Sequence, residues 1–165
     1  MPKTDLIHPD RFTEAGRTFE GVLRPGGLPR LAPELASPEG ELRYAVTARL
    51  EKHQRRVVSC IIDGYVFLTC QSTFEVFRHE IASRDRLVLV GSEEELPPIE
   101  EEIDGEDFVV ATDPLDPVGL VEDAVLLALP MVPRKPGAGP GAEGEAAAPG
   151  KPSPFAALAG LKAPR

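Results

Sequence analysis

The chain has 165 residues, of which 42% are hydrophobic and 27% are charged, and this composition fits one globular domain with a core of modest size. No apolar run reaches the roughly 20 residues of a membrane span, and no apolar segment follows the N-terminus as in a secretory signal, so we expect a cytoplasmic protein without membrane contact. The net charge of −9 repels RNA at long range, which leaves only a local basic patch as a candidate RNA contact.

Strand patterns dominate the first half of the chain. Residues 17–23 alternate between polar and apolar side chains before a Pro-Gly-Gly break, and residues 28–36 form a short helix or an irregular cover. Residues 42–50 show the clearest alternation and pair through a hairpin with residues 56–62. A register that sets Ala48 opposite Cys60 keeps one face apolar.

Further strands complete an antiparallel β-meander. Asp63-Gly64 is a two-residue hairpin signal, after which residues 65–69 return as a third strand. Residues 74–81 form a fourth strand, residues 86–90 continue it or start a fifth, and residues 108–111 add a short edge strand. Because residues 57–68 are apolar on both faces, we expect central strands whose two faces are both covered by other parts of the chain, or a sheet that curls toward a barrel.

A helix signature follows the strands. Asp116 can cap the first turn, Pro117 suits the first helical position, and Pro130 ends the helix. Only Glu122 and Asp123 are polar between these ends, so the helix belongs under a sheet or under a partner. The predicted fold class is therefore α+β, an antiparallel β-meander, barrel-like in one alternative, packed by one buried helix.

The two adjacent carboxylates of this helix leave several interpretations open. They form a solvated strip beside a buried face, or they meet Arg or Lys of a partner. Neighbouring helical positions point about 100° apart, so Glu122 and Asp123 do not act as a close pair on one substrate. A metal-dependent hydrolase that uses both carboxylates is the remaining alternative.

Basic side chains gather around the first hairpin tip. They are the best candidate for an RNA phosphate contact, and a charged, solubilising hairpin explains them as well. No exposed aromatic pair flanks them, so base stacking is not expected. The candidate RNA-contact residues are Arg43, Arg49, Lys52, Arg55 and Arg56, and His53 lies in the same cluster.

Acidic side chains gather in residues 93–107, which hold nine Asp or Glu and no basic residue and so account for the whole net charge. A solvated loop explains such a run, and mimicry of RNA toward a basic protein is the alternative.

Cys60 and Cys70 lack the second Cys or His pair of a zinc site, and the three histidines lie in different elements without a nucleophile motif. We therefore expect no metal, no cofactor and no catalytic residue.

The C-terminal part of the chain changes in composition. Residues 133–153 are rich in Pro, Gly and Ala and predict a disordered linker. The segment 154–165 then places Phe155, Leu158 and Leu161 on one side of a short helix. Because so short a helix is not stable alone, the segment docks on its own domain or in a groove of a partner, or else it is a frayed tail.

Two motifs stand out near the C-terminal end of the sequence. The first is Leu127-Ala128-Leu129-Pro130, at the end of the predicted helix, and the second is Pro154-Phe155-Ala156-Ala157-Leu158-Ala159-Gly160-Leu161-Lys162. Together they resemble the YceD family, whose members are described as large ribosomal RNA subunit accumulation proteins. Many family members carry Cys-x-x-Cys at the turn that holds Cys70. Here the turn is Cys70-Gln71-Ser72-Thr73, so the second cysteine is missing.

The resemblance implies a role in the synthesis, processing or stability of 23S ribosomal RNA. We interpret the chain as a non-enzymatic bacterial accessory factor in ribosome biogenesis that acts through protein contacts, with an RNA-binding module at the basic hairpin as the alternative. The expected organisation is a single α+β domain at residues 1–132, a linker at 133–153 and a docking motif at 154–165. The expected partner-binding residues are Asp116, Glu122, Asp123, Phe155, Leu158, Leu161 and Lys162.

Overall fold

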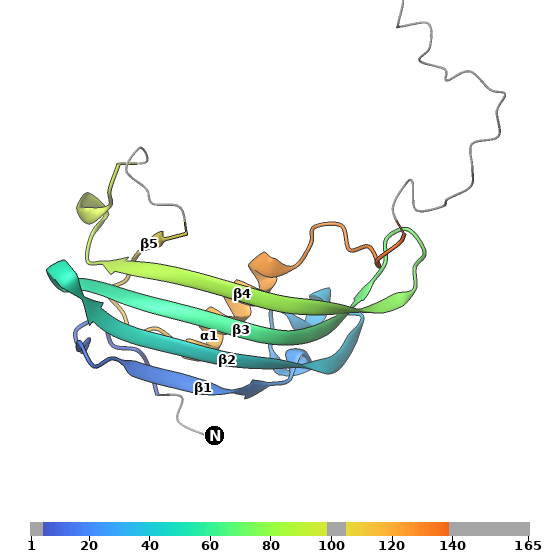
Figure 1. Cartoon of the computed structure of the whole chain (residues 1–165), viewed down its shortest axis with the longest axis horizontal. Helices are drawn as coiled ribbons and strands as arrows, with labels where there is room; N and C mark the ends of the chain where they lie inside the picture. Colours follow the sequence, from blue (N-terminus) through green and yellow to red (C-terminus); the bar gives the residue numbers. More distant parts are fainter. Residues whose placement is uncertain (1–4, 99–104, 139–165) are drawn as a thin grey trace, which may run out of the picture. The chain divides into compact units, whose positions relative to one another are not determined.

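The structure is a computed structural model that describes residues 5–98 and 105–138. The chain divides between Lys135 and Pro136, and the fold given below is that of the first unit, Met1–Lys135. Its described part contains one five-stranded sheet, in the order β1-β2-β3-β4-β5, and one α-helix, α1, that lies against one face of the sheet (Figure 1).

The strands confirm the predicted α+β class and the central position of residues 57–68. Strands β1 to β4 are antiparallel neighbours, whereas the short edge strand β5 runs parallel to β4, so the sheet is mixed. The barrel-like alternative is wrong, because β1 and β5 do not pair and the sheet stays open within the described residues. The elements are β1 (Arg17–Leu23), β2 (Ser37–Glu51), β3 (Arg55–Thr69), β4 (Val76–Val90), β5 (Asp107–Val110) and α1 (Pro117–Ala128).

The predicted turn at Asp63-Gly64 is wrong, because β3 runs straight through both residues. A Cβ atom on Gly64 would lie only 1.9 Å from the carbonyl oxygen of Glu41 on β2. The register between β2 and β3 is also irregular nearby, between Ser37 and Gly40. The glycine therefore serves a close approach of two backbones beside this irregularity and not a hairpin turn.

The predicted register of the first hairpin is wrong by two residues. Ala48 lies opposite Val58, and Glu51 already pairs with Arg55. The tip is this short because His53 and Gln54 both adopt positive φ, 61° and 59°. A shift of two residues returns each side chain to the same face, so the predicted apolar face still points inward.

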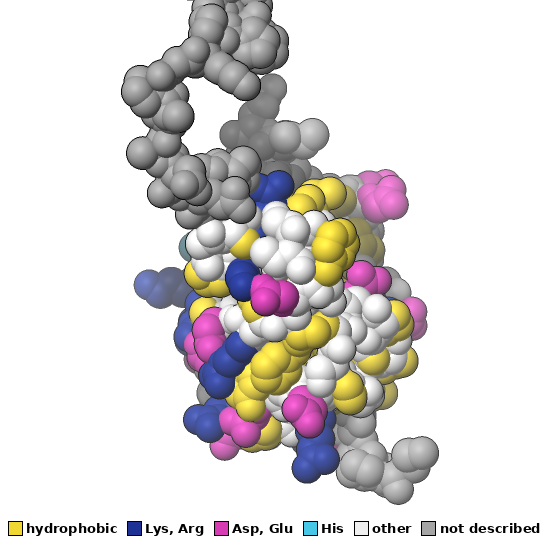
Figure 2. Space-filling model, turned by 90° about the vertical axis from the view of Figure 1, so that its right-hand side faces the viewer, with side chains coloured by type: hydrophobic (Ala, Val, Ile, Leu, Met, Phe, Trp, Pro, Cys, Tyr) yellow, Lys and Arg dark blue, Asp and Glu magenta, His cyan; other side chains and the backbone are white. Residues whose placement is uncertain are grey.

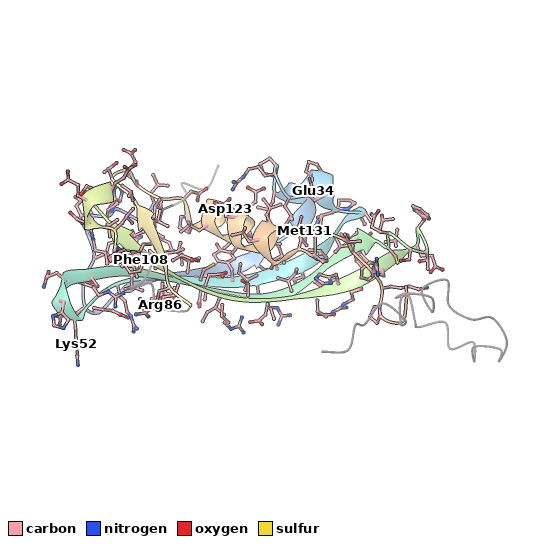
Figure 3. All side chains as sticks on the ribbon, turned by 90° about the horizontal axis from the view of Figure 1, so that it is seen from above. Glu34, Lys52, Arg86, Phe108, Asp123 and Met131 are labelled. Atoms are coloured by element: carbon pink, nitrogen blue, oxygen red, sulfur yellow. The ribbon has the colours of Figure 1, made fainter. Side chains whose placement is uncertain are left out.

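The core lies between the inner face of the sheet and a second layer, which consists of α1 and of the segments outside the strands that precede β2. We call these segments the cover. Val121 and Val125 of α1 and Leu31 of the cover are completely buried, together with Val46 and Ile62 of the sheet. Viewed nearly edge-on, the sheet carries α1 on one side and a layer of outward-pointing side chains on the other (Figure 3). We call this second side the open face. Over residues 5–98 and 105–138, no helix has the length and apolar character needed to cross a membrane.

Candidate interaction sites

Helix α1 begins as predicted. The carboxylate of Asp116 accepts a hydrogen bond from the N–H of Val118 at 3.1 Å, and Pro117 is the first helical residue. This bond satisfies one of the backbone donors that a helix start leaves unpaired. At the other end, the N–H of Leu129 bonds the carbonyl groups of Val125 and Leu126. The caps therefore fix where the helix presents its two acidic side chains.

Glu122 and Asp123 both bind Arg30, in the segment between β1 and β2. One oxygen of Glu122 accepts the N–H of Arg30 at 2.6 Å and the N–H of Leu31 at 3.1 Å, and the other accepts Nε of Arg30 at 3.1 Å. Asp123 accepts Nη1 of Arg30 at 2.5 Å. A single guanidinium thus joins two carboxylates that diverge around the helix, and it fastens α1 to the cover.

The two carboxylates differ in exposure. The side chain of Glu122 is 6% exposed and that of Asp123 is 51% exposed. Burial raises the pKa of Glu122, but hydrogen bonds from the backbone of Arg30 and Leu31 and from the Arg30 guanidinium outweigh it and set the pKa below its usual range. A partner would have to displace Arg30 to reach Glu122. The partner-binding roles of Asp116, Glu122 and Asp123 stay predictions, and all three already serve the fold.

Most of the basic residues predicted to contact RNA lie at the hairpin end of the sheet, whereas Arg43 lies further along β2, opposite Asp63 of β3. Lys52 and His53 occupy the tip, η3 (Lys52–Gln54), which Figure 3 shows at one end of the sheet. Arg49 and Arg55 flank the tip on β2 and β3. These four residues, with Glu14, Leu50 and Glu51, line an open cavity of about 630 Å³. The structure therefore brings these four predicted basic residues together around one hollow.

Carboxylates neutralise most of these basic groups. Arg43 pairs with Glu41 at 2.7 Å and Arg49 pairs with Glu51 at 2.5 Å, two residues away on the same strand. Arg56 instead donates to the carbonyl oxygen of Pro9 at 3.4 Å. Within the described parts of the chain, Lys52 has no ion-pair partner. The hairpin is consequently less basic than its sequence indicates.

Three arginines and two glutamates form a connected ion-pair network on the open face, next to the hairpin tip. Glu51 accepts from Arg86 at 2.5 Å as well as from Arg49, and Glu106 accepts from Arg55 at 2.5 Å and from Arg86 at 2.7 Å. The bond from Arg86 lowers the pKa of Glu51, and the bonds from Arg55 and Arg86 lower the pKa of Glu106. We call Arg49, Glu51, Arg55, Arg86 and Glu106 the open-face cluster.

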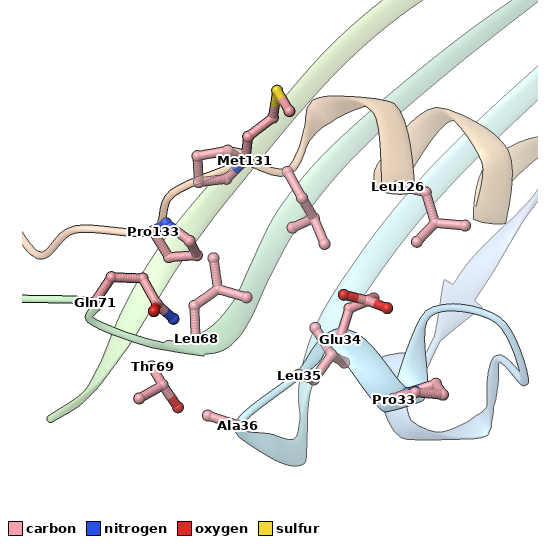
Figure 4. Close-up of a pocket in the computed structure, with 12 residues that line it drawn as sticks. Pro33, Glu34, Leu35, Ala36, Leu68, Thr69, Gln71, Leu126, Met131 and Pro133 are labelled. Atoms are coloured by element: carbon pink, nitrogen blue, oxygen red, sulfur yellow. The ribbon is translucent and has the colours of Figure 1, made fainter. Parts of the chain in front are cut away.

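A groove lies at the other end of the sheet, where α1 and β3 both end. Most of its lining residues are apolar, and we therefore call it the apolar groove, although polar atoms contribute more of its exposed surface than apolar atoms do. Its volume is about 550 Å³, and Figure 4 shows Leu68, Leu126 and Met131 around it. Figure 2 shows the same end of the molecule, on which hydrophobic side chains alternate with charged ones. The lining residues are Pro33, Glu34, Leu35, Ala36, Leu68, Thr69, Gln71, Leu126, Leu129, Pro130, Met131 and Pro133.

Large apolar side chains beside this groove are exposed. Met131 is fully exposed, Leu127 is 87% exposed and Val132 is 54% exposed. Soluble monomers rarely keep such side chains together on the surface unless something binds there. This surface was not predicted from the sequence, because the helix is apolar nearly all round and was assigned as a whole to a position under a sheet or a partner. Leu127 follows the buried Val125 by two positions, which places it about 200° further around the helix, and this spacing could have revealed it.

The two cysteines have different environments. Burial raises the pKa of Cys60 to about 12, as suits the predicted core thiol. Hydrogen bonds from Thr73 and from the backbone of Lys135 lower the pKa of Cys70 to about 6, although the residue is buried. The Lys135 N–H lies 3.5 Å from the sulfur, and Lys135 also pairs with Glu75. Cys70 therefore helps to hold the segment after α1 against the β3–β4 turn.

Two groups of predictions remain open. In the part of the chain that the structure describes, no three His, Cys, Asp or Glu side chains are arranged to hold a metal ion. Phe155, Leu158, Leu161 and Lys162 lie outside the described residues, as does most of the predicted linker.

The comparison with known proteins covers most of the chain. The model of one protein family, described as large ribosomal RNA subunit accumulation protein YceD, matches residues 58–162. The match takes in α1 and most of the residues of the apolar groove, and it begins after the basic hairpin. No solved structure matches the chain. Because the match extends over well more than half of its residues, the chain belongs to the YceD family.

Proposed function

We propose that this protein supports the accumulation of large-subunit ribosomal RNA by binding a protein partner at the apolar groove. The observation that carries the proposal is the full exposure of Met131, which lines a cavity of about 550 Å³, together with the 87% exposure of Leu127, which follows the lining residue Leu126 in α1. Exposed apolar side chains around a hollow are typical of the centre of a protein interface, and methionine adapts to an irregular partner surface. The groove also falls largely within the region that matches the family.

In this proposal the protein is an accessory factor in ribosome biogenesis and not an enzyme. The acidic pair of α1 supports this part, because Glu122 and Asp123 both bind Arg30 and neither lines the groove. A hydrolase would need these carboxylates to converge on a substrate or a metal. The step it serves is the synthesis, processing or stability of 23S ribosomal RNA in the bacterial cytoplasm.

A second candidate function is direct binding of RNA at the hairpin end. The observation that favours it is the cavity of about 630 Å³ lined by Arg49, Lys52, His53 and Arg55. Binding of this kind depends on phosphate contacts and weakens steeply between about 50 and 200 mM salt. RNA affinity that does not change over this range would argue against the second candidate.

The main proposal is tested by capture from cell extract with the intact chain as bait. Leu127→Glu and Met131→Glu, combined in one variant, should abolish co-purification of large-subunit components, since each places a charge in the apolar contact. Val22→Glu is the matched control, because Val22 is also an apolar, 61% exposed residue but lies on β1, opposite Arg43 on the open face of the sheet. A chain that ends at Gly150 tests the predicted docking motif separately. An unchanged set of captured proteins with the groove variant would reject the proposal.

A further inference from the structure

The open face of the sheet carries six arginines, and each of them is hydrogen-bonded to a carboxylate. Most of these carboxylates belong to the strands themselves, as Glu41 and Glu51 on β2, Asp63 on β3 and Glu80 on β4 do. Glu106 is different, because it comes from the connection that precedes β5. The arginines are Arg43, Arg49, Arg55, Arg78, Arg84 and Arg86.

Glu106 bridges two of these arginines from different strands. One of its oxygens lies 2.5 Å from Nη2 of Arg55 on β3, and the other lies 2.7 Å from Nε of Arg86 on β4. The side chain of Glu106 is 11% exposed, whereas the side chains of Arg55 and Arg86 are 33% and 30% exposed. Two oxygens of a phosphate group can bind a pair of guanidinium groups in the same manner. Glu106 therefore occupies a position that suits a phosphate of a nucleic acid.

Glu106 lies in an acidic stretch of the chain and directly follows a glycine. Residues 93–107 hold nine acidic residues and no basic one. Gly105, directly before Glu106, has φ of 88°, and nothing lies within 4 Å of where its Cβ would be. A glycine adopts this left-handed conformation without strain.

Charge explains what the loss of Glu106 would do. With Glu106 in place, the open-face cluster has three guanidinium groups against two carboxylates. Without it, Glu51 is the one carboxylate among the described residues that pairs with the three guanidinium groups, and the hairpin tip with Lys52 lies beside them. Two positive charges in excess within this cluster, close to Lys52, attract a polyanion that the protein as a whole, at −9, repels.

We propose that Arg55 and Arg86 form a binding site for a backbone phosphate of RNA, and that Glu106 occupies this site until RNA displaces it. The inference rests on the second candidate function, RNA binding at the hairpin end, and is independent of the apolar groove. Glu106 acts as an internal competitor, which lowers the apparent affinity for RNA by the fraction of molecules in which it occupies the site. Only RNA that also contacts neighbouring basic residues then binds tightly enough to open it.

The test measures binding of a short, fluorescently labelled single-stranded RNA at about 50 mM salt by anisotropy. Glu106→Gln should bind about tenfold more tightly than the wild type, because a charge-assisted competitor has been removed. Glu80→Gln is the matched control, since it removes one open-face charge that, among the described residues, pairs with Arg78 alone, and it should bind within about twofold of the wild type. Addition of Arg86→Gln to Glu106→Gln should cancel the gain.

The outcomes separate the two levels of the inference. If RNA binds the wild type and both glutamine variants equally, the RNA-binding function stands and the competition by Glu106 is refuted. If RNA binds none of the variants at low salt, the RNA-binding function itself fails. Hydrogen exchange of the wild-type protein gives a measurement that needs no variant. RNA should accelerate exchange in residues 105–110, and unchanged or slower exchange there would also overturn the proposal.

Discussion

Arg30 and Glu122 lie 92 positions apart in the chain, yet the backbone N–H and Nε of Arg30 both donate to the Glu122 carboxylate, at 2.6 and 3.1 Å. The same carboxylate accepts the N–H of the buried Leu31. Glu122 is the only charged side chain among the buried residues described. This contact fastens α1 to the cover and thereby helps to place the end of the helix at the apolar groove.

Glu122→Ala should lower the free energy of unfolding by about 2–3 kcal/mol, because it leaves the N–H groups of Arg30 and Leu31 without their acceptor in a nearly buried position. Chemical denaturation measures this loss. The control is Asp123→Ala, which removes a half-exposed ion pair with the same arginine and should cost less than about 1 kcal/mol. Equal losses for the two variants would show that Glu122 acts only as a surface charge.

Stability should decrease as the pH falls below the range of ordinary glutamate titration. The pKa values of Glu51, Glu106 and Glu122 are lower in the folded protein than the usual 4.5, because arginine side chains and, for Glu122, backbone donors hold the ionised forms. Between 4.5 and these lower values the unfolded chain binds more protons than the folded one, so the stabilisation present above pH 4.5 is lost as the pH falls through the folded-state values.

Denaturation midpoints measured from neutral to acidic pH test this expectation. Glu122→Gln should show a smaller decrease toward low pH than the wild type, since one of the contributing groups no longer titrates. A variant with the same pH profile as the wild type would show that Glu122 does not contribute.

Gly64→Ala should destabilise the protein by about 1–3 kcal/mol or more, because the added methyl group would overlap the carbonyl oxygen of Glu41, 1.9 Å away. Gly27→Ala is a suitable comparison, because nothing lies within 4 Å of the position of its Cβ. Thermal unfolding of the two variants distinguishes them. A Gly64→Ala protein as stable as the Gly27→Ala protein would contradict the close approach of β2 and β3.

Gly64 also shows where prediction from sequence succeeds and fails. An Asp-Gly pair between two apolar runs has the signature of a hairpin, and only the backbone of β2, distant in sequence, reveals that the glycine serves a close contact. The error of two residues in the predicted register did not change the face of the sheet to which each side chain was assigned, because side chains alternate with a period of two. Local signals, such as the cap at Asp116 and the following Pro117, predicted α1 correctly.

The candidate sites were harder to predict because they depend on contacts between distant segments. Arg43 and Arg49 have acidic neighbours two residues away, on the same face of the strand, and the sequence contained that signal. The pairing of Arg55 and Arg86 with Glu106 joins residues from three parts of the chain, and no local pattern indicates it. For Glu122 and Asp123 the sequence left a solvated strip and a contact with a partner as alternatives, and it did not indicate that Arg30 of the same chain pairs with both.

Cys70 should react with iodoacetamide before Cys60 does. With a pKa of about 6, Cys70 is largely a thiolate at neutral pH, whereas the Cys60 thiol, with a pKa of about 12, stays protonated and buried. Because Cys70 is covered, its alkylation requires local opening at Lys135, and Glu75→Gln should accelerate it by removing the ion pair that holds this lysine. Mass spectrometry of the modified peptides, from pH 5 to 8, should show a rate for Cys70 that rises through about pH 6. Equal modification of both cysteines would contradict these environments.

The amount of large-subunit ribosomal RNA in cells tests the proposed function most directly. The native gene is replaced by one that encodes Leu127→Glu and Met131→Glu, or by one that encodes the Val22→Glu control, and the ratio of large-subunit to small-subunit ribosomal RNA is measured alongside the level of the protein. We predict that the ratio falls for the groove variant and stays at the wild-type value for the control, since only the former changes the exposed side chains beside the groove. A wild-type ratio in cells that contain the groove variant at its normal level would contradict the account.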